Sequence, residues 1–352
     1  MTHKTSHSFA AALALTTLAA PAAFAQSTVT IYGTMDAGLT VSKTGAPGVG
    51  SIKGVSSGNQ VANRLGFRGT EDLGGGLQAL FNLESGIDLD TGSPQTLGTG
   101  GFWARRSVVG LKGPFGEVTL GRDYTPGFWL VFFSDRHSSG LPGNVLVASQ
   151  LSDSRTNNGV FYTSPSLGGV TGRLAVAAGE GITGKLYGGS VEYRSGGLYA
   201  AVAAMRRDTL ATATAPEGST DQLGLGAQYR FGAYAVNAGF WQGDPVDGAT
   251  GSVAKTRAYW LGAGATFGEH VIYAQVAKTE FDFVAHASGA GTTYGIAYNY
   301  FLSKRTNLYA GYGGVNNDAN SRLALLIGTE RTGGTTPGAD PKALTAGVVH
   351  RF

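Results

Sequence analysis

The sequence predicts an all-β fold, a transmembrane antiparallel β-barrel of about 16 strands. Two observations predict it: strand-length stretches in which hydropathy alternates, and connections between them that are alternately tight and long. This alternation of connection lengths places short turns at one end of the sheet and long loops at the other, so the two ends face different surroundings. The tight breaks fall at 70–76, 112–116, 164–169, 195–197, 231–233, 267–270 and 302–306, and the long connections at 42–62, 86–101, 124–158, 178–185, 207–220, 243–255, 280–292 and 315–342.

Each strand has one apolar and one mostly polar face, because successive strand side chains point to opposite sides. A soluble sandwich shows the same period, so the alternation favours the barrel only together with the loop rhythm. Three stretches illustrate the pattern: Leu77, Ala79, Phe81 and Leu83 oppose Gln78, Leu80, Asn82 and Glu84; Leu223, Leu225, Ala227, Tyr229 and Phe231 oppose Gln222, Gly224, Gly226, Gln228 and Arg230; Leu344, Ala346, Val348, His350 and Phe352 oppose Ala343, Thr345, Gly347, Val349 and Arg351.

The two ends of the chain carry patterns of their own. Residues 1–25 are typical of a secretory signal, with a basic start around Lys4, an apolar core at 9–20 and a small-residue cleavage site ending at Ala25. We expect cleavage there, which leaves residues 26–352 as a single barrel domain. The last strand ends on the aromatic Phe352, which suits a strand that closes a barrel and leaves no free edge.

Composition excludes several classes of protein. Charged residues make up 14% of the chain against about 25% in typical soluble domains, and its 57 glycines are about twice the usual share. A formal net charge of +3 is too small to indicate nucleic-acid binding. The chain contains no catalytic or phosphate-binding motif, and its scattered histidines lack metal-ligand spacing, so we expect no enzyme, no cofactor and no metal site.

Charged residues inside the strands are expected to face the lumen. Leu65 and Phe67 share an apolar face, which turns Arg64 and Arg68 the other way, and an arginine facing lipid at mid-membrane would cost about 2–4 kcal/mol. Asp36 and Glu84 are lumenal by the same alternation. Arg122 shares parity with Val118 and Leu120. Either a bulge intervenes there, or the inner wall is apolar because something packs on it.

The connection 124–158 could be what packs there. It is the longest of the connections and unusually apolar for an external loop, with the run 128–133 (FWLVFF) followed by Leu141. Folding into the barrel would bury these aromatics against Val118 and Leu120 and narrow the pore. An external flap at a subunit contact is the alternative.

Four segments resemble the general porins of Gram-negative bacteria, especially the trimeric sixteen-stranded porins of β-proteobacteria. They are 29–38 (VTIYGTMDAG), 63–76 (NRLGFRGTEDLGGG), 108–124 (VVGLKGPFGEVTLGRDY) and 347–352 (GVVHRF), and 300–312 (YFLSKRTNLYAGY) adds the penultimate turn and strand. The resemblance runs from about residue 27 to the end of the chain. It implies a homotrimer in the outer membrane, in contact with lipid and lipopolysaccharide, that passes small hydrophilic solutes and ions without a catalytic step or a cofactor.

The resemblance also implies a constriction, in which the third external loop folds inward opposite a basic wall. By position, Arg64, Arg122 and Arg155 would form that wall, and Arg68 and one of Arg105 or Arg106 could join them. The loop would contribute Asp135, flanked by Arg136. Because the arginines outnumber the loop acids, we expect a weak anion preference. A substrate-specific channel with a solute-binding constriction, or a barrel that only displays its loops, are the alternatives.

Overall fold

The computed structural model describes residues 28–95, 101–137, 140–181, 183–211, 216–246, 253–284, 287–328 and 330–352; the predicted signal segment 1–25 lies outside them. Two helices, α1 (Pro126–Phe133) and α2 (Val145–Ala148), interrupt the strands. The strands are β1 (Thr28–Lys43), β2 (Ile52–Ser57), β3 (Arg64–Gly74), β4 (Leu77–Asp88), β5 (Ser93–Gln95), β6 (Arg106–Gly113), β7 (Gly116–Tyr124), β8 (Arg155–Thr163), β9 (Val170–Ala177), β10 (Leu186–Ser195), β11 (Leu198–Thr209), β12 (Gly218–Phe231), β13 (Tyr234–Val246), β14 (Val253–Phe267), β15 (His270–Phe283), β16 (Gly289–Phe301), β17 (Thr306–Asn317), β18 (Leu325–Ile327), β19 (Glu330–Thr332) and β20 (Lys342–Arg351).

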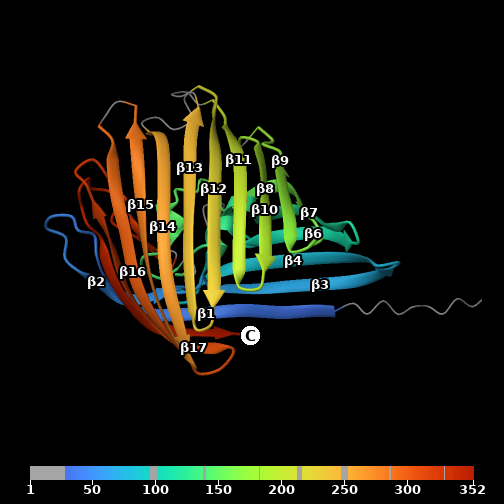
Figure 1. Ribbon diagram of the computed structural model, residues 1–352, viewed down its shortest axis with the longest axis horizontal. Helices are drawn as coiled ribbons and strands as arrows, with labels where there is room; N and C mark the ends of the chain where they lie inside the picture. Colours follow the sequence, from blue (N-terminus) through green and yellow to red (C-terminus); the bar gives the residue numbers. More distant parts are fainter. Residues whose placement is uncertain are drawn as a thin grey trace, which may run out of the picture.

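The described strands form a closed antiparallel barrel of 16 strands, as the sequence predicted (Figure 1). β2 and β3 together make one barrel strand, because they pair with successive halves of β1. β1 also pairs with β20, which closes the sheet. β5 only extends the end of β4, and β18 and β19 form a separate ribbon in the last long connection. Closure leaves no unpaired edge between the first and last strands.

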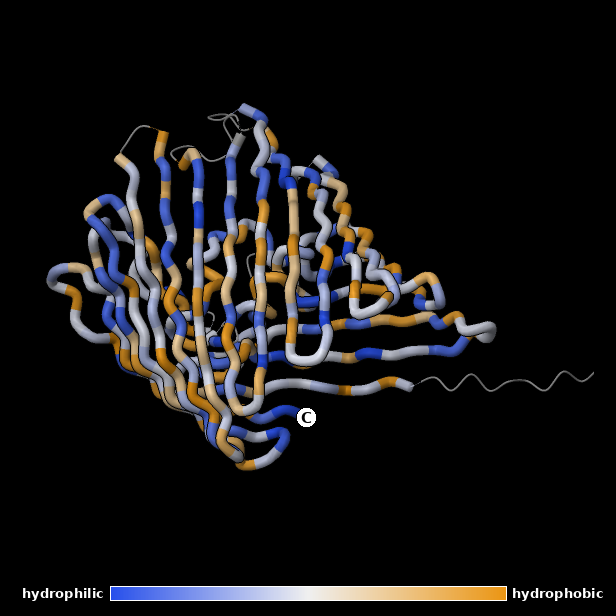
Figure 2. The backbone as a smooth tube through the Cα atoms, viewed as in Figure 1, coloured by the Kyte–Doolittle hydropathy of each residue, from blue (hydrophilic) through white to orange (hydrophobic). Residues whose placement is uncertain are grey.

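The barrel is inverted relative to a soluble protein. Many large aliphatic and aromatic side chains are exposed, whereas polar residues such as Glu84, Gln222 and Asn299 are buried on the inner face. Apolar and polar positions alternate along the strands at the front of the view in Figure 2. A hydrocarbon solvent outside and a polar interior require this arrangement. Near the tight turns the outer face carries rings in mutual contact, an aromatic girdle of Tyr229, Phe231, Tyr234, Phe267, His270, Tyr298 and Tyr300.

Loop lengths follow the predicted rhythm. The connections β3–β4, β6–β7, β10–β11, β12–β13 and β14–β15 are tight turns, and the first residues of β1 lie beside the chain end at the same side, where Gly33 and Phe352 exchange backbone hydrogen bonds of 3.0 and 3.1 Å. The long connections lie at the opposite end. Of the two helices described, neither has the length and hydropathy to span a bilayer.

The connection between β7 and β8 folds into the barrel, as predicted. α1 begins at the cap Thr125, whose side chain accepts from the N–H of Phe128, and Pro126 suits the first turn because its missing N–H would be unpaired there. The helix is apolar all round, which favours burial of most of its surface. Leu130 and Val131 are fully buried with Trp241 and Trp260 of the inner wall.

The wall that α1 packs against differs from the predicted one. α1 contacts β9 to β12, whereas Leu120 of β7 is 51% exposed and points outward. The expectation that Val118 and Leu120 pack against the loop was therefore wrong. The loop crosses the lumen and reaches β16, where the glycines Gly143 and Gly295 let the two backbones approach: a Cβ on Gly295 would meet the carbonyl of Pro142.

Candidate functional site: the channel lumen

A first group of arginines lies where β3, β4, β7 and β8 meet the start of the inward loop. We call Arg64, Glu84, Arg105, Tyr124 and Arg155 the Tyr124 cluster. The carboxylate of Glu84 accepts from Arg105 Nε at 2.8 Å and lies 3.7 Å from Arg64 Nη1. The hydroxyl of Tyr124 accepts from both Arg105 Nη2 at 2.9 Å and Arg155 Nη2 at 2.7 Å. One carboxylate and one phenol thus fix three guanidiniums.

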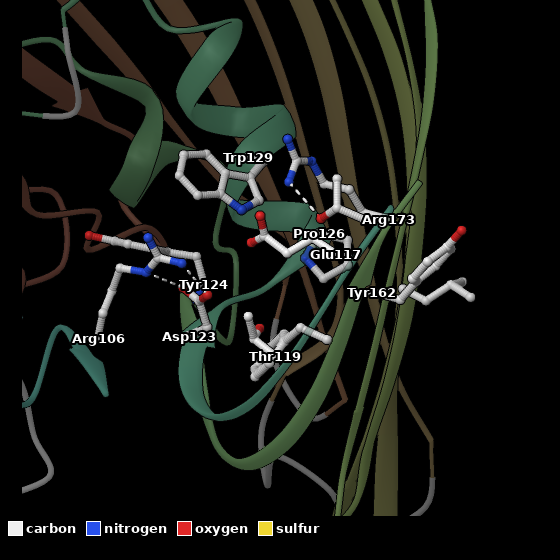
Figure 3. A pocket seen from close by; sticks show the side chains of 12 residues that line it. Arg106, Glu117, Thr119, Asp123, Tyr124, Pro126, Trp129, Tyr162 and Arg173 are labelled. Carbon is white, nitrogen blue, oxygen red and sulfur yellow. Dashed lines mark hydrogen bonds and ion pairs between the residues drawn. The ribbon is translucent and has the colours of Figure 1, made fainter. Parts of the chain in front are cut away.

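Arg106, which follows the cluster in sequence, binds a different acid. Its Nε and Nη2 donate to the two carboxylate oxygens of Asp123 at 2.8 and 2.6 Å. Figure 3 shows this pair beside Pro126 and Trp129 of α1, in a narrow recess of about 50 Å³ between the helix and the wall. The sequence left open whether Arg105 or Arg106 turns inward. Both bind acids here, because Arg105 lies before β6 begins and does not follow the strand alternation.

The structure does not bring Arg68 and Arg122 into the cluster. Arg68 is exposed on the inner parity of β3, with its guanidinium 5.1 Å from the ring centroid of Tyr32. Arg122 keeps the parity of outward-facing Leu120, and it donates to the backbone oxygen of Ala104 and to Asn157, both at 2.6 Å. The β7–β8 ladder does shift between Gly121 and Asp123, and two residues of β8 oppose Arg122 there. The bulge that the sequence raised as an alternative is therefore present, on the neighbouring strand.

Asp36 stabilises the interruption between β2 and β3. Its carboxylate accepts the N–H groups of Gln60 and Val61 at 2.6 and 2.8 Å and the hydroxyl of Tyr309 at 2.7 Å. The residue is fully buried. Asp36 lies on the inner side of β1 and is enclosed by the segment 58–63 that folds over it.

The inward loop places Asp135 and Arg136 at the opposite wall. Asp135 accepts from the N–H groups of His137 and Val145 and from Gln275 Nε2 at 2.8 Å. Arg136 donates through Nη1 to Gln228 at 3.1 Å. Burial, and then the proximity of Arg230, lower the pKa of the Arg136 guanidinium. The acid is thus engaged in the fold of the loop, and the arginine lies close to a second cation.

Below the loop, toward the tight turns, lies a cavity of about 580 Å³ that we call the vestibule. Gly196 and Gly197 of the β10–β11 turn line its rim. Its charged lining comprises one acid and four arginines: Asp135, Arg136, Arg194, Arg230 and Arg351. Sequence reasoning missed Arg194, Arg230 and Arg351 as site residues. The alternation did place Arg230 and Arg351 on polar faces, which is the signal that could have indicated them.

Within the described ranges, no group of three or more His, Cys, Asp or Glu side chains could hold a metal ion. Phe132, Phe133, Tyr199 and Tyr273 complete the vestibule wall between the arginines. The lumen is thus a passage lined by fixed guanidiniums, amides and rings. Such a lining can orient and concentrate solutes by charge and contact.

Comparison with known proteins gives the family. Residues 10–320 match the Gram-negative porin family. The chain is 34% identical to outer membrane porin protein 32 of Delftia acidovorans, over 97% of this chain and 99% of the relative. It is 32% identical to the major outer membrane protein P.IB of Neisseria gonorrhoeae, over 55% of this chain and 56% of that protein.

Solved structures agree. The anion-selective porin from Comamonas acidovorans superposes with a TM-score of 0.80 at 31% identity, covering 93% of this chain and all of that one. The trimer form of OmpT from Vibrio cholerae has the same fold, with a TM-score of 0.73 at 15% identity over 93% of this chain and 99% of that one. The chain therefore belongs to the Gram-negative porin family, and it is an outer-membrane channel for the passive diffusion of small hydrophilic solutes and not an enzyme.

Proposed function

We propose that this channel passes small anions in preference to cations. The observation that carries the proposal is the vestibule, where four guanidiniums face one carboxylate that is already engaged by the loop backbone and Gln275. A unit charge about 4 Å from an ion in water is worth about 1 kcal/mol, which changes local ion concentration several-fold. The similarity of this chain to the anion-selective porin from Comamonas acidovorans supports the same proposal.

In this proposal the Tyr124 cluster and the inward loop form the constriction. Arg64 and Arg155 supply its basic side, with Arg68 toward the tight turns. Arg122, on the outward parity of β7, supports the wall behind them through its hydrogen bonds to Ala104 and Asn157. Asp135 and Arg136 supply the loop side, and Glu84 and Asp36 hold the wall. The fixed hydrogen bonds of Glu84 and Tyr124 support a rigid opening, which would set a size limit. Solutes cross by diffusion, oriented by the charges around them.

The reversal potential of the refolded channel in a planar bilayer under a potassium chloride gradient tests the preference. We expect chloride to be more permeable than potassium by about fivefold at 0.1 M salt. The preference should fall toward unity at 1 M, where the screening length is about 3 Å. A reversal potential of the cation-selective sign at low salt would refute the proposal.

The alternative is a substrate-specific channel whose constriction binds one solute. Linear flux with solute concentration supports general diffusion. Flux that saturates at low concentration of a single solute class would favour the alternative. Folded protein without ion conductance would favour the third possibility, a barrel that displays its loops.

We also propose that the barrel is a homotrimer set in outer-membrane lipid and lipopolysaccharide. The resemblance to trimeric porins and the apolar outer face support this assembly. Cross-linking in outer-membrane vesicles should give a band of three subunits, and conductance should rise in groups of three steps. A single uncross-linked subunit carrying full conductance would contradict it.

The N-terminal segment completes the proposal. Cleavage after Ala25 would leave residues 26–352 as the mature single-domain barrel. Sequencing the N-terminus of protein taken from outer membranes should give Gln26 as the first residue. A different first residue would move or remove the cleavage site.

A further inference from the structure

The vestibule has an aromatic side that ion permeation does not require. Phe132 and Phe133 of α1 are partly exposed to it, although Leu130 and Val131 of the same helix are fully buried. The ring of Phe133 contacts that of Tyr199 at 5.4 Å between centroids. Apolar ring surface in a hydrated passage is unfavourable by about 25 cal/mol per Å² until something apolar covers it.

One guanidinium lies against these rings. Arg194 Cζ is 4.1 Å from the centroid of Phe133 and 4.4 Å from that of Tyr199, and its Nη2 lies 3.4 Å from Glu192. The hydroxyl of Tyr199 has no hydrogen-bond partner among the described residues, although the residue is only 4% exposed. The site is therefore built from flat surfaces with a polar atom left unsatisfied.

Two further guanidiniums of the vestibule are placed to bind a negatively charged group. Arg136 and Arg230 both line the vestibule, and the positive charge of Arg230 is near enough to act on the Arg136 guanidinium. An anion between them would relieve their mutual repulsion. Guanidiniums bind carboxylates with paired hydrogen bonds, which fixes orientation as well as charge.

We propose that the vestibule is a binding site for small planar aromatic carboxylates. The carboxylate of the ligand binds Arg136 and Arg230, and its ring lies against Phe132, Phe133 and the guanidinium of Arg194. The volume of about 580 Å³ lies within the range of ligand sites and holds one such ring with room for water beside it. The inference deepens the proposed anion preference, since it names the solute class that the channel would retain.

Current fluctuations of the channel in potassium chloride test the site with a pair of probes. Benzoate has a flat ring, and cyclohexanecarboxylate has the same charge and a similar size without one. We expect benzoate to interrupt the current with an apparent affinity about tenfold higher than that of cyclohexanecarboxylate. Because the vestibule opens toward the tight turns, addition from that side should give the faster association. Equal block by the two probes, or block by neither, would overturn the proposal.

Variants of the vestibule distinguish the contribution of the aromatic contact to binding from that of the positive charge. Phe133→Leu should bring benzoate down to the affinity of cyclohexanecarboxylate, whereas Arg230→Gln should weaken both probes. Arg206→Gln removes an exposed arginine from the loop end of β11, away from the vestibule, and should change neither. Heat-modified gel migration reports folding, and Phe132→Leu repeats the test if Phe133→Leu does not fold. A folded Phe133→Leu channel that still binds benzoate more tightly than cyclohexanecarboxylate would overturn the proposed site.

The same recordings distinguish the two proposals. Phe133→Leu removes no charge, so its reversal potential should keep the anion-selective sign while its benzoate discrimination disappears. A wild-type channel that prefers potassium yet discriminates benzoate would refute the anion preference and leave the aromatic site standing. A chloride-selective channel without discrimination would do the reverse.

Discussion

Arginine side chains have different roles in the Tyr124 cluster and in the vestibule. In the cluster, Glu84 lies between two guanidiniums and Tyr124 joins two, so the arginines are components of a rigid wall. In the vestibule, the partners include neutral amides and rings: Arg136 donates to Gln228, and Arg351 donates to Asn307 at 3.1 Å. The comparison teaches that geometry matters most in the first region and charge in the second.

The largest effect should come from removing the carboxylate of the cluster. Glu84→Gln leaves two guanidiniums without their anion at a site where Glu84 is 3% exposed. Breaking a buried ion pair on one side costs about 3 kcal/mol. Urea unfolding of the barrel in lipid vesicles should show that loss in the free energy of unfolding.

The control is an exposed ion pair. Glu280→Gln removes the partner of Lys278, 2.7 Å away at the loop end of β15, and should cost less than about 1 kcal/mol. Equal losses in both variants would mean that the cluster is as hydrated as the surface. The contrast between the two regions would then fail.

The next effect tests geometry directly. Arg105→Lys keeps the charge but cannot reach Glu84 and Tyr124 together, because an ammonium lacks the planar fork of a guanidinium. Arg105 is 3% exposed, so we expect a loss of about 2 kcal/mol in the free energy of unfolding. Arg206→Lys at the exposed end of β11 is the matched control and should be neutral. A neutral Arg105→Lys would show that charge alone holds the cluster.

The barrel and its turns could be predicted because they depend on local alternation and turn residues. The turn between β12 and β13 and the polar face of Gln228 and Arg230 both follow from residues that are neighbours in sequence. Arg122 and Arg105 could not be placed in the same way. The first depends on two residues of β8 opposing one residue of β7, and the second lies just before β6 begins.

The vestibule was beyond prediction for another reason. Its arginines lie on the inward loop and on β10, β12 and β20, which are far apart in sequence. Alternation indicated which of them point inward but not that these strands and a loop bring them around one cavity. That depends on the path of the loop across the lumen, fixed by close contacts such as that of Gly143 with Gly295.

A third prediction concerns the residue that follows Asp135 and Arg136 in the inward loop. His137 is fully buried, with Nδ1 2.8 Å from the carbonyl of Pro142 and its ring against Tyr273. Burial lowers the pKa of His137, an effect that the charge of Asp135 opposes. The unfolded chain, with a histidine pKa of about 6.5, therefore takes up the proton first.

This difference in pKa between the folded and the unfolded chain determines the direction in which stability changes with pH. Stability is complete above about pH 6.5 and falls as the pH drops below it, by up to about 1.4 kcal/mol per pH unit from this group. His137→Gln should remove that part of the slope, measured as the difference between wild-type and variant unfolding free energies from pH 7.5 to 5. Parallel pH profiles for the two proteins would show that His137 ionises as freely in the barrel as in the unfolded chain.

The smallest expected effect comes from the variant that tests the charge of the vestibule. Arg351→Gln should lower the chloride preference about twofold at 0.1 M salt and leave it unchanged at 1 M, because the vestibule field is screened. Arg351→Lys should retain the wild-type reversal potential, since a point charge serves where no fork is needed. Loss of the preference in Arg351→Lys would mean that the vestibule also depends on guanidinium geometry. The two arginine groups would then differ in location and not in the way that they work.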